Sequence, residues 1–171
     1  MDFKREGLIR AAGVSNFELP ALQAAASAGS VDAVQSCYNL LQRDVEADVL
    51  PWCERNGVSF IPWGGLAYGL LGGGYSRTFK LHDSDWRHRT GMFGGDVFER
   101  NMDTVDGLKA IAMKCGSTPG HLALQWLLSQ SSVGSVIAGA KSAGQVTDNV
   151  AAENAGVSTE HLASIDSLTK S

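Results

Sequence analysis

The sequence predicts an α/β protein built on a parallel sheet. Short apolar segments of strand length recur along the chain, and each is followed by a segment whose apolar residues have helical spacing. The expected strands are residues 9–14, 31–38, 58–63 and 133–138. Strands that alternate with helices are joined by right-handed crossovers and lie parallel in one sheet. An open doubly wound sheet fits this pattern, and so does part of a (β/α)8 barrel, which normally needs about 250 residues.

The composition is typical of one soluble domain spanning residues 1–171. Of the 171 residues, 44% are hydrophobic and 19% are charged, which is enough apolar material for one core. A net charge of -4 offers no basic field for nucleic acid, and no stretch approaches the roughly 18 apolar residues of a membrane span. We therefore expect neither nucleic acid nor a membrane as a partner.

Cysteine and histidine usage predicts a reduced protein without a metal site. Cys37, Cys53 and Cys115 have neither metal-ligand nor CxxC spacing, and the four histidines fit no metal geometry. The first ten residues are too charged for a signal peptide. These observations favour a cytoplasmic location.

Cap and stop signals predict where the helices lie. Residues 3–7 resemble the last turn of a helix that ends at glycine. Ser15 and Glu18 have capping-box spacing, so a helix is expected from there to Gly29, and Asp44 is expected to cap the helix that ends at Gly57. The later helices are expected at residues 101–115, 119–128, from 143 onward behind a Ser142 and Gln145 capping box, and at 158–168. Residues 76–100 have no usable periodicity and are predicted to form an irregular surface loop or lid.

A glycine-rich stretch follows the third expected strand. Residues 58–75 read VSFIPWGGLAYGLLGGGY, so an apolar strand runs directly into a segment with six glycines. Glycine lets the backbone turn where side chains would obstruct, and this brings main-chain amides close to a ligand. The segment is therefore predicted to hold a ligand that carries phosphate.

Several polar or aromatic residues follow the ends of the expected strands, at the edge where parallel α/β folds bind ligands. Each also has a purely structural interpretation. Ser15 and Asn16 could cap a helix, Trp63 could fill core, and Lys141 could be a solvated charge instead of a phosphate contact. Gln35 is expected to be buried in its strand, where its amide would need a hydrogen-bonding partner.

Four motifs, in this order and spacing, resemble the aldo-keto reductase family: GVSNF, QSCYNLLQR, WGGLAYGLLGG and GAKSAGQVTDN. The resemblance covers essentially the whole chain. It implies a (β/α)8 barrel, also called a TIM barrel, that binds NADP(H) and reduces small-molecule aldehydes or ketones. This chain matches strands five to eight with their helices, which is the C-terminal half of such a barrel.

The resemblance also implies which residues bind the cofactor. Ser15, Asn16 and Gln35 match the positions that hold the nicotinamide carboxamide, and Trp63 matches the aromatic residue that stacks on the nicotinamide ring. The matches to the pyrophosphate segment are Leu66, Gly69, Leu71 and Gly72. The matches around the adenosine 2'-phosphate are Gly139, Ala140, Lys141 and Gln145, and those that contact adenine are Asp148 and Asn149. Gln145 stands where many relatives have arginine, and Gly65 and Ala138 where many have proline, so the preference for NADP over NAD stays open.

No catalytic residue is expected in this chain. In the family, a catalytic tetrad of Asp, Tyr, Lys and His lies on the first four strands, and Tyr38, Tyr68 and Tyr75 match none of these roles. The favoured interpretation is the cofactor-binding half of a reductase, completed by a missing N-terminal half or by a second copy in a homodimer. The alternatives are a non-catalytic nucleotide-binding or regulatory module, a truncated reading frame without a function of its own, and a self-contained flavodoxin-like open sheet.

Overall fold

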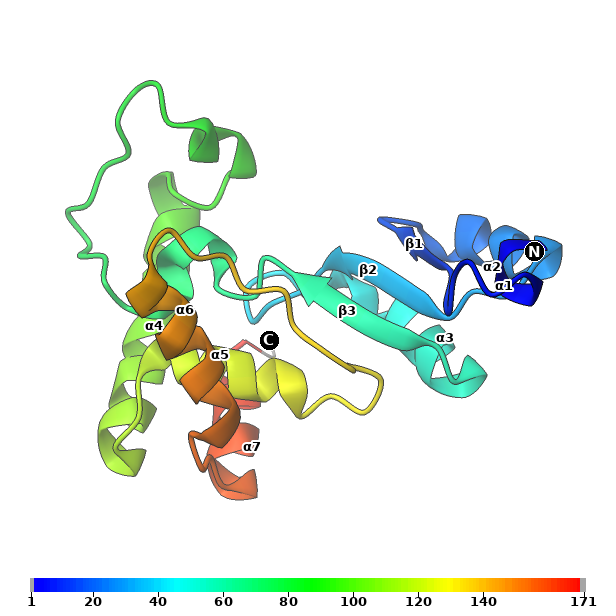
Figure 1. Cartoon of the computed structure of the whole chain (residues 1–171). Coiled ribbons are helices and arrows are strands. Elements are labelled where there is room, and N and C mark those ends of the chain that lie inside the picture. The colour runs from blue at the N-terminus through cyan, green and yellow to red at the C-terminus, as the bar shows by residue number, and fades with distance from the viewer. Residues whose placement is uncertain (1, 170–171) are drawn as a thin grey trace. The chain divides into compact units, whose positions relative to one another are not determined.

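The computed structural model describes residues 2–169 and divides into two compact units (Figure 1). Unit 1 consists of the described residues up to Gly65 together with Leu127–Ile137. Unit 2 consists of Leu66–Trp126 together with the described residues from Ala138 onward. The single domain expected over residues 1–171 stays a prediction.

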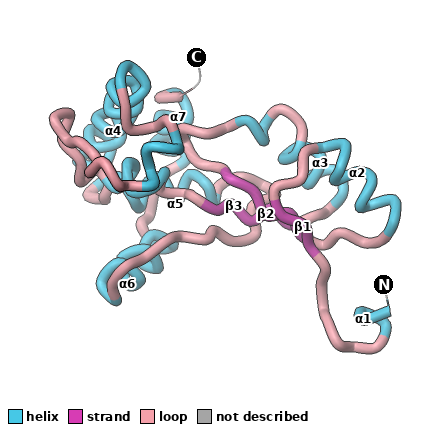
Figure 2. Tube along the Cα trace, turned by 90° about the horizontal axis from the view of Figure 1, so that it is seen from above, coloured by secondary structure: helices cyan, strands magenta, loops and turns pink. Residues whose placement is uncertain are grey.

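Unit 1 is a parallel sheet with helices, which confirms the predicted α/β class. Its strands are β1 (Gly13–Ser15), β2 (Ala33–Cys37) and β3 (Ser59–Trp63), hydrogen-bonded in the order β1-β2-β3. The helices are α1 (Asp2–Arg5), α2 (Leu19–Ala28) and α3 (Val49–Asn56), and α2 and α3 lie on one face of the sheet (Figure 2). Burial alternates along β2 and β3, because successive side chains of a strand point to opposite faces. Val34 and Phe60 are fully buried, on the face that the helices cover.

The fourth predicted strand, residues 133–138, is not formed as a regular strand. Two isolated parallel bridges, Phe60 with Val133 and Trp63 with Ile137, join this segment to β3. Two residues of β3 lie between the bridged positions, whereas three lie between them on the other segment, so the other segment has one extra residue. Pro62 lies between the bridges and has no N–H to donate, although its carbonyl oxygen accepts from Ile137 N at 2.9 Å. The missing donor therefore explains why the ladder is interrupted.

Two predicted helix starts in unit 1 are wrong. Ser15 belongs to β1, and α2 begins after Glu18, whose side chain makes no cap hydrogen bond. Pro20 in the first turn fixes this start, because proline is tolerated only there. Asp44 opens the short 3-10 helix η1 (Asp44–Glu46), and α3 begins later with Asp48 as its cap. The predicted glycine stop of α3 is confirmed, since Gly57 has a left-handed φ of 64°.

Unit 2 is mainly helical. Its α-helices are α4 (Gly95–Cys115), α5 (Pro119–Leu128), α6 (Ala143–Ala151) and α7 (Thr159–Ser167), although the last two residues of α5 fall in unit 1. Its 3-10 helices are η2 (Ala67–Gly72), η3 (Trp86–Thr90) and η4 (Ala152–Asn154). The nearly all-apolar α5 is covered as predicted, with Leu122, Ala123, Leu124 and Trp126 buried. None of the helices within residues 2–169 is long and apolar enough to span a membrane.

The irregular segment is shorter than predicted. Helix α4 starts at Gly95 instead of residue 101, because Phe98, Met102 and Val105 already form its buried stripe. The remaining irregular residues, 76–94, include η3. The predicted Ser142 cap of α6 is confirmed, since its side chain accepts from Gln145 N. The Ser158 side chain accepts from His161 N and caps α7, which was not predicted from the sequence.

Candidate functional site

Three residues predicted to form the site lie on one face of the sheet in unit 1. In the parallel register Ser15 is paired with Gln35, Gln35 with Ile61, and Cys37 with Trp63. Side chains at registered and alternate positions point the same way, so Ser15, Gln35 and Trp63 share the face opposite Val34 and Phe60. Ser15 and Trp63 end β1 and β3, whereas Gln35 is the middle residue of β2, and their joint role in one ligand site stays a prediction.

Asn16 is fixed to Trp63 at the same end of the sheet. Its backbone N–H donates to Gln35 O at 2.8 Å, and its φ of 57° then turns the chain out of β1. Its side-chain Oδ1 accepts from the indole Nε1 of Trp63 at 3.0 Å. An indole N–H can only donate, so the amide must present its oxygen to Trp63. The amide NH₂ of Asn16 consequently remains a donor, without a partner among residues 2–169.

The expectation of a buried Gln35 is corrected by the structure. The side chain is only half-buried, because it lies on the face that α2 and α3 do not cover. Its amide is therefore open to a ligand or to water, and the argument that burial forces it to have a partner no longer holds.

Asn39 is a residue that the site prediction missed. It is fully buried, and its Nδ2 donates to Gly64 O at 3.0 Å and to Gln42 Oε1 at 3.1 Å. Its Oδ1 accepts from Leu41 N at 2.9 Å. The side chain thus joins the turn after β2 to the residue that follows Trp63. A polar residue directly after a predicted buried strand was the available signal.

The glycine-rich segment of unit 2 has an unusual backbone. Ala67, Tyr68 and Gly69 all have positive φ, at 48°, 57° and 96°. Gly69 N and Leu71 N both donate to Leu66 O, at 2.9 and 3.2 Å, so these two amides are satisfied within the segment. Gly72 has open space around the position of an added Cβ. The turn is therefore held by its own hydrogen bonds, and any phosphate contact has to use other amides.

Residues 139–149 comprise the turn before α6 and the first seven residues of that helix, which Ser142 caps. Gln145 Oε1 accepts from Lys141 N at 2.6 Å, and Asn149 Nδ2 donates to Gly139 O at 3.2 Å. Gln145 thus closes the turn that leads into the helix, together with the cap made by Ser142. Lys141 is exposed and takes part in no ion pair of the described residues, which leaves its ammonium group open to an anion.

The start of α5 contacts both the glycine-rich segment and α6. Atoms of Gly72 and Leu66 lie 3.8 Å from where a Cβ on Gly120 would stand, so the backbone of α5 packs against the glycine-rich segment. His121 Nε2 is 3.0 Å from Asp148 Oδ1 on α6. Gly120 and His121 therefore support the predicted pyrophosphate and adenine residues. Sequence reasoning placed His121 in a helix and did not find this contact.

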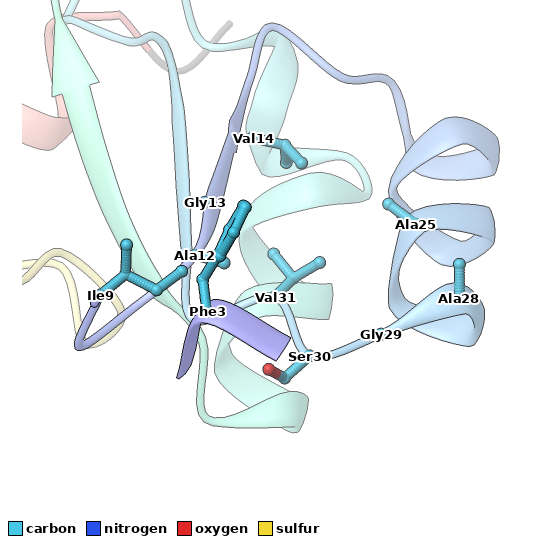
Figure 3. A pocket seen from close by; sticks show the side chains of 10 residues that line it. All are labelled: Phe3, Ile9, Ala12, Gly13, Val14, Ala25, Ala28, Gly29, Ser30 and Val31. Atoms are coloured by element: carbon cyan, nitrogen blue, oxygen red, sulfur yellow. The ribbon is translucent and has the colours of Figure 1, made fainter. Parts of the chain in front are cut away.

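Unit 1 also contains a pocket, of about 600 Å³, that holds none of the predicted site residues (Figure 3). It lies beside the amino-terminal end of β1, whereas Ser15, Asn16 and Trp63 lie at the carboxyl ends of the strands. Its lining is mainly apolar: Phe3, Ile9, Ala12, Gly13, Val14, Ala25, Ala28, Gly29, Ser30 and Val31. No metal-binding cluster of His, Cys, Asp or Glu occurs within residues 2–169.

Comparison with known proteins identifies the family. The model of the aldo/keto reductase family matches residues 1–170. This chain belongs to the aldo/keto reductase family. It is 30% identical over 141 residues to the aldo-keto reductase YhdN of Bacillus subtilis (strain 168), covering 82% of this chain and 43% of the relative. It is 30% identical over 161 residues to the NADH-specific methylglyoxal reductase of Escherichia coli (strain K12), covering 92% and 48%.

Solved structures of the family share the fold. The glycerol dehydrogenase AKR11B4 from Gluconobacter oxydans superposes with a TM-score of 0.88 at 28% identity, covering 98% of this chain and 51% of that one. The aldo-keto reductase AKR11C1 from Bacillus halodurans, in its holo form, gives a TM-score of 0.76 at 26% identity, covering 99% and 53%. This aldo/keto reductase chain thus spans about half the length of these relatives.

Proposed function

We propose that this chain is the nicotinamide-cofactor-binding half of an aldo-keto reductase-type oxidoreductase. The observation that carries the proposal is the polar face of unit 1. There Ser15 and Gln35 are paired in register, and the NH₂ group of Asn16 is left as a donor by the hydrogen bond to Trp63. A carboxamide needs both donors and acceptors, and this set offers both. The proposed nicotinamide-binding residues are Ser15, Asn16, Gln35 and Trp63.

The rest of the cofactor is assigned to residues of unit 2. We propose that the segment with Leu66, Gly69, Leu71 and Gly72 lies along the pyrophosphate, with Gly69 and Leu71 shaping the turn because their own amides are bonded to Leu66 O. We propose Gly139, Ala140, Lys141 and Gln145 for the 2'-phosphate, and Asp148 and Asn149 for adenine. The exposed Lys141 and the capped start of α6 support this assignment, because helix N-termini and free ammonium groups attract phosphate. The proposed cofactor is NADP(H). NADH is the second candidate, since one relative is named as NADH-specific.

For the fold, we propose that the parallel strands correspond to strands five to eight of a (β/α)8 barrel. The match to about half of each related structure supports this, as does the position of residues 133–137 beside β3. A bound nicotinamide cofactor would supply the hydride for reducing an aldehyde or ketone. The residues of this chain would orient the carboxamide and hold the phosphates. The cytoplasmic location predicted from the sequence is part of the same proposal.

A binding module without turnover is the second candidate function. It is favoured by the engagement of two tyrosines: Tyr38 OH donates to Glu46 Oε1 at 2.7 Å in the core, and Tyr75 OH accepts from Arg87 Nη1 at 2.6 Å. A general acid must reach the oxygen that it protonates, and Tyr38 is fully buried. Detectable cofactor binding without any turnover would favour this module.

The proposed function is tested by titrating the full chain with NADPH and NADH while tryptophan fluorescence is measured. In Asn16→Asp, a carboxylate can still accept from Trp63 Nε1, but the NH₂ donor is lost and a negative charge faces the carboxamide oxygen. We expect the affinity to fall by roughly tenfold or more. Asn154→Asp makes the same chemical change at an exposed position and is the control. Equal affinities of the two variants, or no binding by the wild-type chain, would contradict the proposal.

A further inference from the structure

Arg87 connects the irregular segment of residues 76–94 to the glycine-rich segment of unit 2. Its guanidinium is held first by Asp85, with Nε 3.0 Å from Oδ1 and Nη2 2.7 Å from Oδ2. Both side chains are about four-fifths buried, with relative exposures of 18% for Arg87 and 20% for Asp85. The hydrogen bonds from Arg87 lower the pKa of Asp85 to about 2. Because a guanidinium is planar, two hydrogen bonds to Asp85 fix its orientation, and the direction of the third nitrogen, Nη1, is fixed with it.

That third nitrogen is directed at the glycine-rich segment. Arg87 Nη1 donates to Tyr75 OH at 2.6 Å, and Tyr68 O lies at 3.5 Å. The guanidinium carbon also lies over the Phe93 ring, 5.2 Å from its centroid. One arginine therefore contacts both ends of the stretch from Tyr68 to Tyr75.

The Tyr75 hydroxyl in turn lies against Gly69, since a Cβ added there would stand 3.3 Å from the oxygen. Tyr68 and Gly69 have left-handed φ angles of 57° and 96°, and Tyr68 is not a glycine. Such a conformation persists only where the surroundings hold it in place. The buried side of the segment is held by Ala67, Leu70 and Leu71, all with no exposed surface. Its polar side is held by Arg87 and Tyr75.

We propose that Arg87 is a positioning residue that, through Tyr75, holds Tyr68 and Gly69 in the shape needed to receive the diphosphate of a dinucleotide. The inference rests on the proposed function, because it takes residues 66–72 as the diphosphate-binding segment. Arg87 itself is not assigned a contact with the ligand. Its effect on binding is indirect and is confined to the diphosphate.

The test compares Arg87→Met with Arg77→Met in the full chain. Arg77 also lies in the irregular segment of residues 76–94. Its guanidinium, however, binds Glu99, Asp103 and Asp106 of α4, at 2.7 to 3.0 Å, and not the glycine-rich segment. Amide hydrogen exchange is measured for the peptide that covers residues 66–75. We expect exchange to accelerate about tenfold in Arg87→Met, to be partly restored in Arg87→Lys, and to be unchanged in Arg77→Met. Tyr75→Phe removes only the hydroxyl and should reproduce the acceleration if Arg87→Met fails to fold.

The second readout is the affinity for two probes, ADP-ribose, which contains the diphosphate, and adenosine 2'-monophosphate, which does not. Arg87→Met should weaken ADP-ribose binding about tenfold and leave adenosine 2'-monophosphate binding unchanged. Equal losses for both probes would indicate general destabilisation and overturn the inference, as would exchange in Arg87→Met equal to that in Arg77→Met. Accelerated exchange in a chain whose wild type binds neither probe would retain the structural connection but refute both the diphosphate role and the proposed function. Binding of both probes, unaffected by Arg87→Met, would refute the inference alone.

Discussion

Replacing Asn39 by alanine should cost about 3 kcal/mol of unfolding free energy. The side chain has no exposed surface and makes three hydrogen bonds with nitrogen and oxygen atoms, besides a longer one from Nδ2 to Cys37 Sγ. Two run from Nδ2, to Gly64 O and Gln42 Oε1, and one from Leu41 N to Oδ1. Each contributes about 1 kcal/mol net, and a buried partner left unsatisfied adds to the loss. For a domain with about 5–15 kcal/mol of total stability, this change is large.

Urea unfolding followed by circular dichroism measures the effect. Asn101→Ala is the matched control, because Asn101 is half-buried and its Nδ2 donates to Met92 O at 2.9 Å as its one side-chain hydrogen bond among residues 2–169. It should cost about 1 kcal/mol. Asn39→Asp should be as harmful as alanine, since a carboxylate would face two acceptor oxygens. If Asn39→Ala is no more destabilising than Asn101→Ala, the connection between the turns after β2 and β3 does not stabilise the fold.

Three further predictions concern the cofactor, turnover and pH. The full chain should bind NADPH more tightly than NADH, and Lys141→Ala should remove most of that preference, since charge-assisted phosphate contacts contribute roughly 1.5–3 kcal/mol. Lys114→Ala is the control. Equal affinities of the wild-type chain for NADPH and NADH in a fluorescence titration would contradict this prediction. The purified chain should show no NADPH-dependent aldehyde reduction above background, because it is expected to lack the general acid, which contributes about 10² to 10⁴-fold to the rate. Steady-state turnover that Tyr75→Phe abolishes would instead show that the chain has an acid of its own. Arg87 lowers the pKa of Asp85 to about 2, so the unfolded state binds more protons between pH 2 and about 4. Stability should fall as pH drops through that window, and urea midpoints should depend less steeply on pH in Asp85→Asn; an unchanged slope would count against the ion pair.

Periodicity and glycine stops were sufficient for much of the fold. The α/β class, β2, β3 and the cap of α6 were predictable, because each depends on a few neighbouring residues. The fourth strand was not, since its pairing depends on Pro62 in a strand more than 70 residues away. The start of α2 could have been placed from Pro20, which limits how early that helix begins.

For the site, the motif positions were predictable but the contacts were not. Nothing local to residue 16 shows that its amide meets Trp63, and nothing local to His121 shows that it meets Asp148. Both contacts join segments that are 27 or more residues apart. The partial exposure of Gln35 was missed because a strand flanked by apolar residues was expected to be covered on both faces.

The hydrogen bond between Asn16 and Trp63 makes the two positions evolutionarily dependent on each other. An isolated amide can rotate by half a turn and exchange its oxygen for its nitrogen at little cost, so it distinguishes poorly between donors and acceptors. The indole N–H of Trp63 removes this ambiguity, because it can only donate and therefore favours the orientation in which the amide oxygen faces it. With phenylalanine at position 63 there would be no N–H to fix the orientation of the Asn16 amide, and the asparagine would lose its advantage at position 16. Exchanges at these two positions are therefore expected to occur together.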